Sequence, residues 1–138
     1  MGTGRTDRAG RSPPTYAVGF IQRSDRRYLI FRQASGGAAA HWQFPRGLVR
    51  QDESPEAAMR RVAQEQVGIE VQLDVGQPPL LVELEGREVC FRCFLAGVIR
   101  EASHRPCGIE LQWVQAVQLL EFDFGPEYRQ IVPWLADL

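Results

Sequence analysis

The segment GLVRQDESPEAAMRRVAQEQVGIEV, residues 47–71, decides the fold because it carries the best-marked helix of the chain. Ser54 is a favourable N-cap, and Pro55 is favourable at the first helical position. Gly68 can adopt the left-handed backbone conformation that ends many helices. These signals predict a helix over residues 54–67, entered from an irregular loop.

Short runs rich in aromatic and β-branched residues on both sides of this helix predict strands. The expected strands cover residues 15–23, 26–34, 69–75 and 109–114, with two more in residues 80–100 around the turn Glu85–Gly86–Arg87. Residues 114–122 and 125–138 are expected to form short helices. Strands around one well-capped helix, with further helices late in the chain, indicate an α/β (α+β) fold whose mixed sheet packs between helices.

The bulk composition is that of one globular domain. The chain has 138 residues, 44% of them apolar and 24% charged, with a formal net charge of -1. This charge gives no field that would draw the whole molecule onto nucleic acid or an anionic membrane. Residues 1–14, rich in Gly, Pro, Arg and Ser, are expected to form a flexible tail, and residues 15–138 a single domain.

The cysteines and basic residues limit the kinds of metal and phosphate site that the chain can form. Cys90 and Cys93 form a C-x-x-C on an expected strand, where positions three apart point to opposite faces, so structural thiols are favoured over a metal knuckle. Reduced thiols, with no secretory signal and no membrane-spanning stretch, indicate a cytoplasmic protein. All 16 basic residues are arginine, so a basic side chain that contacts phosphate must be a guanidinium.

The predicted helix carries polar side chains that favour a cation site. Residues three and four apart share a helical face, which groups Val62, Glu65 and Gln66. Arg61 and Glu65 are four apart and can pair, and Glu53 lies in the loop just before the helix. Magnesium is bound in proteins by one or two carboxylates together with substrate phosphates and waters.

At this point the sequence resembles the Nudix box, G-x5-E-x7-R-E-U-x-E-E-x-G-U, in which U is a bulky aliphatic residue. Val62 and Gln66 replace two glutamates of that pattern, and Ala63 is small for its aliphatic position. Residues 31–47, FRQASGGAAAHWQFPRG, resemble the segment before the box in the dinucleoside-tetraphosphate and RNA-pyrophosphate branches of the family. The positions that agree with the box are Gly47, Glu53, Arg61, Glu65, Gly68 and Ile69.

The resemblance implies a Nudix-like α/β/α sandwich and a hydrolase of a nucleoside diphosphate linked to another group, assisted by magnesium or manganese. A dinucleoside polyphosphate or a 5′-pyrophosphorylated RNA end would be the substrate. Because Val62 and Gln66 carry no charge, the activity is expected to be weakened. The alternative is a catalytically inactive Nudix fold that serves as a nucleotide-binding or interaction module.

The resemblance also assigns catalytic and metal-binding roles. Glu65 would be a metal ligand, Glu53 a supporting ligand, and Arg61 would orient these carboxylates. Glu110, on the expected strand of residues 109–114, is a further candidate ligand. The alternatives are a surface pair for Arg61 and Glu65, a solvated loop carboxylate at Glu53 and a solvated strand residue at Glu110.

Four residues are candidates for substrate binding. Trp42 can stack on a base, and Arg46 can clamp a phosphate through two parallel N–H groups. Gly47 opens the loop at the site, and Tyr128 can stack against the ligand or hydrogen-bond to it. The alternative for Trp42 and Tyr128 is packing on the core.

Overall fold

The computed structural model describes residues 12–34, 40–102 and 106–138, so most of the predicted N-terminal tail lies outside the described residues. Its strands are β1 (Thr15–Gln22), β2 (Tyr28–Gln33), β3 (Arg46–Leu48), β4 (Ile69–Gly76), β5 (Leu80–Leu84), β6 (Arg87–Glu101) and β7 (Ile109–Val114). The helices are α1 (Pro55–Val67) and α2 (Ile131–Ala136), and two short 3-10 segments are η1 (Ala116–Glu121) and η2 (Pro126–Tyr128).

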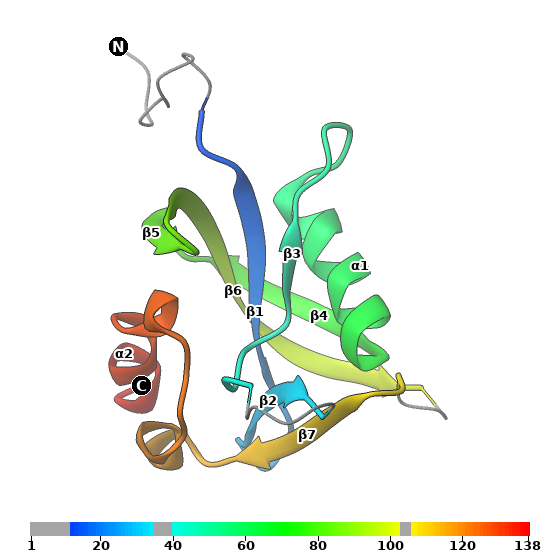
Figure 1. Ribbon diagram of the computed structural model, residues 1–138. Coiled ribbons are helices and arrows are strands. Elements are labelled where there is room, and N and C mark those ends of the chain that lie inside the picture. The colour runs from blue at the N-terminus through cyan, green and yellow to red at the C-terminus, as the bar shows by residue number, and fades with distance from the viewer. Residues whose placement is uncertain (1–11, 35–39, 103–105) are drawn as a thin grey trace.

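The strands form one mixed seven-stranded sheet of order β4-β6-β1-β2-β7, with β3 paired to β1 and β5 paired to β6. Strands β1 and β6 are parallel, and the other paired strands are antiparallel. Helix α1 covers one face, and α2 with the 3-10 segments covers the other (Figure 1). The predicted sandwich, a mixed sheet between helices, is confirmed.

Alternation along the strands builds a separate apolar core on each face of the sheet. On β1, Ala17 and Ile21 belong to the core under α1, while Val18 and Phe20 belong to the core under the C-terminal segments. Cys93 lies in the second core, where burial raises the pKa of its thiol to about 12. The thiol is therefore a packed apolar group at neutral pH.

Helix α1 begins and ends where its capping residues predict. The Ser54 hydroxyl accepts a hydrogen bond from the amide of Ala57, at 3.0 Å. Gly68 takes a left-handed conformation, with φ of 70°, and its amide donates back to the last turn of the helix. The helix of residues 54–67 is confirmed, and none of the helices in the described residues is long and apolar enough to cross a membrane.

Candidate functional site

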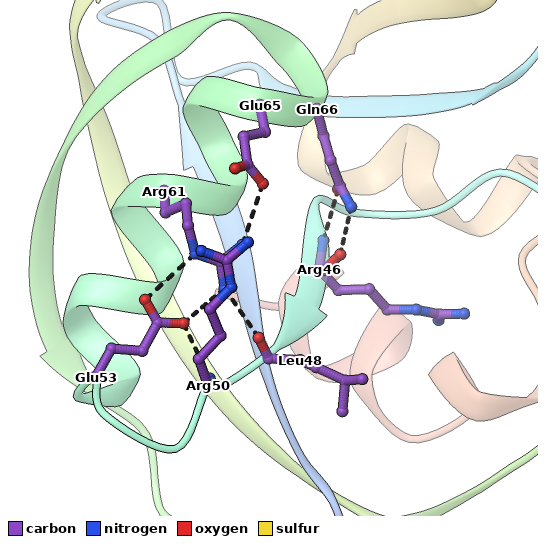
Figure 2. A network of polar contacts seen from close by, with 7 residues as sticks. All are labelled: Arg46, Leu48, Arg50, Glu53, Arg61, Glu65 and Gln66. Carbon is purple, nitrogen blue, oxygen red and sulfur yellow. Dashed lines mark hydrogen bonds and ion pairs between the residues drawn. The ribbon is translucent and has the colours of Figure 1, made fainter.

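Arg61 is the centre of the polar network at the loop and helix of the Nudix-box segment (Figure 2). Its guanidinium donates to both oxygens of Glu53, with Nη2–Oε1 at 2.6 Å and Nε–Oε2 at 3.2 Å. Nη1 donates to Oε1 of Glu65 at 3.1 Å, and Nη2 also donates to the carbonyl of Leu48 at 3.0 Å. One side chain thus joins two carboxylates and the end of β3.

The two carboxylates on Arg61 differ in what remains available to a ligand. Glu53 also accepts from the amide of Arg50 at 3.0 Å, and its side chain is only 15% exposed. The hydrogen bonds from Arg61 and then Arg50 lower the pKa of Glu53 to about 2. Glu65 is 56% exposed and has a single hydrogen-bonding partner in the described part of the chain. Glu65 is therefore the more open carboxylate.

Val62 is part of the core rather than of the polar face. It is 2% exposed, in the core beneath α1. A Cβ added at Gly47 would lie 2.6 Å from Cγ2 of Val62, so the valine packs directly on the glycine backbone. The isopropyl group thus fills the space between α1 and β3 at the position where the Nudix box has a glutamate.

Gln66 bridges α1 to the backbone of β3 (Figure 2). The amide of Arg46 donates to Oε1 of Gln66 at 3.0 Å, and Nε2 of Gln66 donates to the carbonyl of Arg46 at 2.6 Å. Both polar atoms of the glutamine are engaged, so the second replaced position also has a structural role.

Arg46 sends its side chain to the C-terminal segment. Its Nη1 donates to Oε2 of Glu127 at 2.6 Å and to the Tyr128 hydroxyl at 3.0 Å. Tyr128 is fully buried, and burial raises its pKa to about 12. Tyr128 therefore contacts Arg46 and the core. In this conformation it has no exposed surface through which to make the predicted contact with a ligand.

Trp42 and Glu110 are linked through Arg32. The Arg32 guanidinium lies 4.5 Å from the centroid of the Trp42 ring, and Trp42 is 5% exposed. Arg32 also pairs with Glu110, with Nε–Oε1 at 2.9 Å, where β2 and β7 face each other. The structure thus places Trp42 in packing contact and Glu110 in an ion pair outside the Arg61 network.

A cavity of about 350 Å³ adjoins Arg46, between the segment before β3, the β5–β6 turn and η2. Its polar lining mixes one arginine with carboxylates and a histidine. The residues concerned are His41, Gln43, Arg46, Glu83, Glu85 and Glu127. This cavity adjoins both Trp42 and Arg46, two of the predicted substrate-binding residues, and its lining combines apolar surface with one guanidinium and three carboxylates.

The residues at Arg61 offer few oxygen donors to a divalent cation. In the described part of the chain, no three or more His, Cys, Asp or Glu side chains gather where they could hold a metal ion. Glu65 and Glu53 both lie at Arg61, whereas Val62 offers no oxygen and the oxygen of Gln66 is engaged. A magnesium ion held here would take most of its ligands from phosphate and water, because Arg61 engages both oxygens of Glu53 and one oxygen of Glu65.

Two contacts of the site lay beyond sequence reasoning. The engagement of Glu127 with Arg46 joins residues 81 apart, and no local pattern marks it. The dual use of Gln66 has a partial signal, because its replacement of a glutamate was visible in the box. The sequence does not identify Arg46 as the partner of Gln66, because that pairing depends on the placement of β3 beside α1.

Comparison with known proteins identifies the class. The model of the NUDIX domain matches residues 13–135, and the chain belongs to this family. A MutT-like protein of Streptomyces ambofaciens is 38% identical over 66 residues, which cover 46% of this chain and 41% of that protein. An RNA pyrophosphohydrolase of Saccharophagus degradans is 42% identical over 52 residues, 38% of this chain and 30% of that protein. The matches thus span less than half the length of these relatives.

Solved structures show the same fold. A structure from a study of MutT of Aliivibrio salmonicida and Vibrio cholerae has a TM-score of 0.70 and 23% identity, covering 91% of this chain and 97% of that one. A NUDIX hydrolase of Nitrosomonas europaea has a TM-score of 0.73 and 19% identity, covering 88% and 87%. The Nudix-like α/β/α sandwich implied by the resemblance is therefore confirmed.

Proposed function

We propose that this chain is a slow, divalent-cation-assisted hydrolase of a nucleoside diphosphate linked to another group. The observation that carries the proposal is the open carboxylate of Glu65, held beside Glu53 by the shared guanidinium of Arg61. Membership of the NUDIX family supports the reaction class.

The chemistry at this site needs charge rather than a covalent group. A bound magnesium or manganese ion would neutralise phosphate oxygens and polarise a water molecule, and Glu65 with Glu53 would hold it. Arg61 fixes the direction of both carboxylates before substrate arrives, which limits the reorganisation required during reaction. With Val62 and Gln66 in place of carboxylates, we expect a rate lower by about 10²–10³ for each missing group, by analogy with other electrostatic groups.

The substrate class follows from Arg46 and the adjoining cavity. Arg46 is the one arginine in the lining of the cavity of about 350 Å³, which also holds Glu83, Glu85 and Glu127, so the proposed phosphate contact rests on the Arg46 guanidinium itself and not on the charge of the cavity. Two of the similar proteins are RNA pyrophosphohydrolases, which favours a 5′-pyrophosphorylated RNA end alongside dinucleoside polyphosphates. Localisation in the cytoplasm, where such substrates occur, remains part of this proposal.

A second candidate function is nucleotide binding without cleavage. The specific observation in its favour is that both replaced positions are built into the fold, with Val62 packed on Gly47 and Gln66 bonded to Arg46. In that case the Arg61 network stiffens the loop, and binding proceeds without a metal ion.

Turnover and binding, measured together, test the proposal. Purified protein is incubated with diadenosine tetraphosphate and with triphosphorylated RNA, with magnesium, manganese or EDTA, while product release is followed. Calorimetry is run in parallel with a non-hydrolysable analogue. Release that requires the metal ion supports the hydrolase. Metal-independent binding with no release in any condition supports the second candidate and overturns the first.

A further inference from the structure

We propose that Glu127 is a positioning residue that holds the Arg46 guanidinium ready to bind a phosphate group of the substrate. The inference rests on the proposed function and adds a residue from the C-terminal segment to its site. It starts from the way Arg46 is held at both ends, its backbone by Gln66 and its side chain by Glu127 and Tyr128.

Among the described residues, the Arg46 guanidinium donates hydrogen bonds through one nitrogen, Nη1. Glu127 and Tyr128 both accept from Nη1, at 2.6 Å and 3.0 Å. Within the described part of the chain, Nε and Nη2 make no hydrogen bond. These two nitrogens form the edge of a guanidinium that presents two parallel N–H groups, the arrangement that binds a phosphate or carboxylate in bidentate fashion.

The surroundings restrict the side chain to this position. The Arg46 guanidinium carbon lies 5.9 Å from the Phe91 ring centroid and 5.4 Å from that of Tyr128. The Arg46 and Glu127 side chains are 17% and 12% exposed, so their ion pair is partly shielded from water. An arginine fixed in advance loses less conformational entropy when a ligand binds.

Glu127 is itself held against the turn that precedes it. Its carboxylate lies over Gly125, where an added Cβ would clash with Oε1 and the neighbouring carboxylate atoms. The backbone of Gly125 has a φ of -62°, which alanine tolerates, so Gly125→Ala would displace the carboxylate without straining the turn. This glycine therefore provides a second way to remove the contact while Glu127 stays in the sequence.

A competing role makes the opposite prediction. If Glu127 only neutralised Arg46, it would act as an internal anion that the substrate must displace. Its removal would then strengthen phosphate binding. In the positioning role, removal of the carboxylate lets the arginine move, and phosphate binding weakens.

The test measures the affinity for α,β-methylene-ADP, a non-hydrolysable diphosphate, by calorimetry at low temperature. Glu127→Ala and Gly125→Ala should each weaken binding by about 2- to 10-fold, the cost of ordering one free arginine side chain. Glu127→Gln keeps an oxygen that accepts from Arg46 and should recover most of the lost affinity. The control Glu121→Ala removes the same charge from an exposed position of η1 and should match the parent.

A double-mutant cycle separates positioning from general damage to the fold. Arg46→Met keeps an apolar stem over Phe91, and Glu127→Ala added to it should weaken binding no further. Tighter binding by Glu127→Ala, equal binding, or an equal loss in the Arg46→Met background would each overturn the inference. If the parent does not bind α,β-methylene-ADP, the proposed function and this inference are both overturned. If the parent binds it and Glu127→Ala leaves the affinity unchanged, the inference alone is overturned.

Discussion

The side-chain amide of Gln66 pairs with both backbone polar groups of Arg46, accepting at 3.0 Å and donating at 2.6 Å. A glutamate at this position can accept from the Arg46 amide but cannot donate to the Arg46 carbonyl. Glutamine thus ties α1 to β3 through two hydrogen bonds where the Nudix box would place a charge. The single replacement of glutamate by glutamine therefore removes a box carboxylate and also provides this bridge.

Restoring the two carboxylates should therefore cost stability before it helps catalysis. Val62→Glu together with Gln66→Glu places one charge at a buried position and removes the donor to Arg46. Without metal we expect a loss of about 2–4 kcal/mol in the free energy of unfolding. Excess magnesium should return part of that stability and raise the rate of hydrolysis, because it binds the folded state. Urea denaturation with and without magnesium measures the first effect.

The matched control for this variant is Gln64→Glu, which adds a charge at an exposed position of α1. Its unfolding free energy should stay within about 0.5 kcal/mol of the parent. If the double variant were as stable as this control in EDTA, Val62 and Gln66 would have no structural role of the kind inferred here.

Gly47 should tolerate no side chain while Val62 is present. A Cβ at Gly47 would lie 2.6 Å from Cγ2 of Val62, so Gly47→Ala overpacks the junction of α1 and β3. We expect a loss of about 1–3 kcal/mol in unfolding free energy. In the Val62→Ala background the added methyl group has room, and the loss should largely disappear. Chemical denaturation of the four proteins gives the coupling energy, and additive effects would contradict the direct packing.

The Glu53–Arg61 contact should persist far into the acid range. Arg61, and then the Arg50 amide, lower the pKa of Glu53 to about 2 in the folded protein. A depressed pKa stabilises the fold above the ordinary glutamate pKa, about 4.3, and this contribution disappears as the pH falls towards 2. The stability difference between the parent and Glu53→Gln should accordingly be constant near neutral pH and shrink below about pH 4. Carbon NMR of the Glu53 carboxyl group, or denaturation across pH, measures it; titration at an ordinary pKa would contradict the contact.

Local signals made α1 predictable from the sequence. Ser54, Pro55 and Gly68 mark its ends without any knowledge of the rest of the fold, and the Arg61–Glu65 pair follows from spacing along one helix. The direction in which the helix faces was harder to predict. Val62, Glu65 and Gln66 share a face, but the sheet buries Val62, half-buries Gln66 and leaves Glu65 exposed.

Contacts between distant segments were beyond the sequence for a different reason. The pairing of Arg32 with Glu110 depends on β2 and β7 being neighbours and on their register, which a single sequence does not specify. Tyr128 is a candidate for ligand contact in the sequence because its side chain can stack against a ligand or hydrogen-bond to it. Its burial between Phe44, Phe91 and Arg46 arises from the docking of that segment on the sheet.

The most direct test of hydrolysis is the substitution Glu65→Gln. Glu65 is the exposed carboxylate of α1 at the Arg61 network, and the amide keeps its size while removing its charge. Stability should change by no more than about 0.5 kcal/mol, as for an exposed ion pair. Turnover of diadenosine tetraphosphate should fall by about 10²–10³, and EDTA should do the same to the parent, because both treatments remove charge that acts on the phosphates.

The matched control is Glu70→Gln, which removes an exposed carboxylate paired with Arg100 on the strands β4 and β6, and it should retain full turnover. Stopped assays with and without magnesium, beside calorimetry with the non-hydrolysable analogue, distinguish the two functions. Turnover that survives Glu65→Gln would place the reacting phosphate elsewhere in the molecule, and nucleotide affinity that survives both the substitution and EDTA, with no turnover in the parent, would identify a binding module.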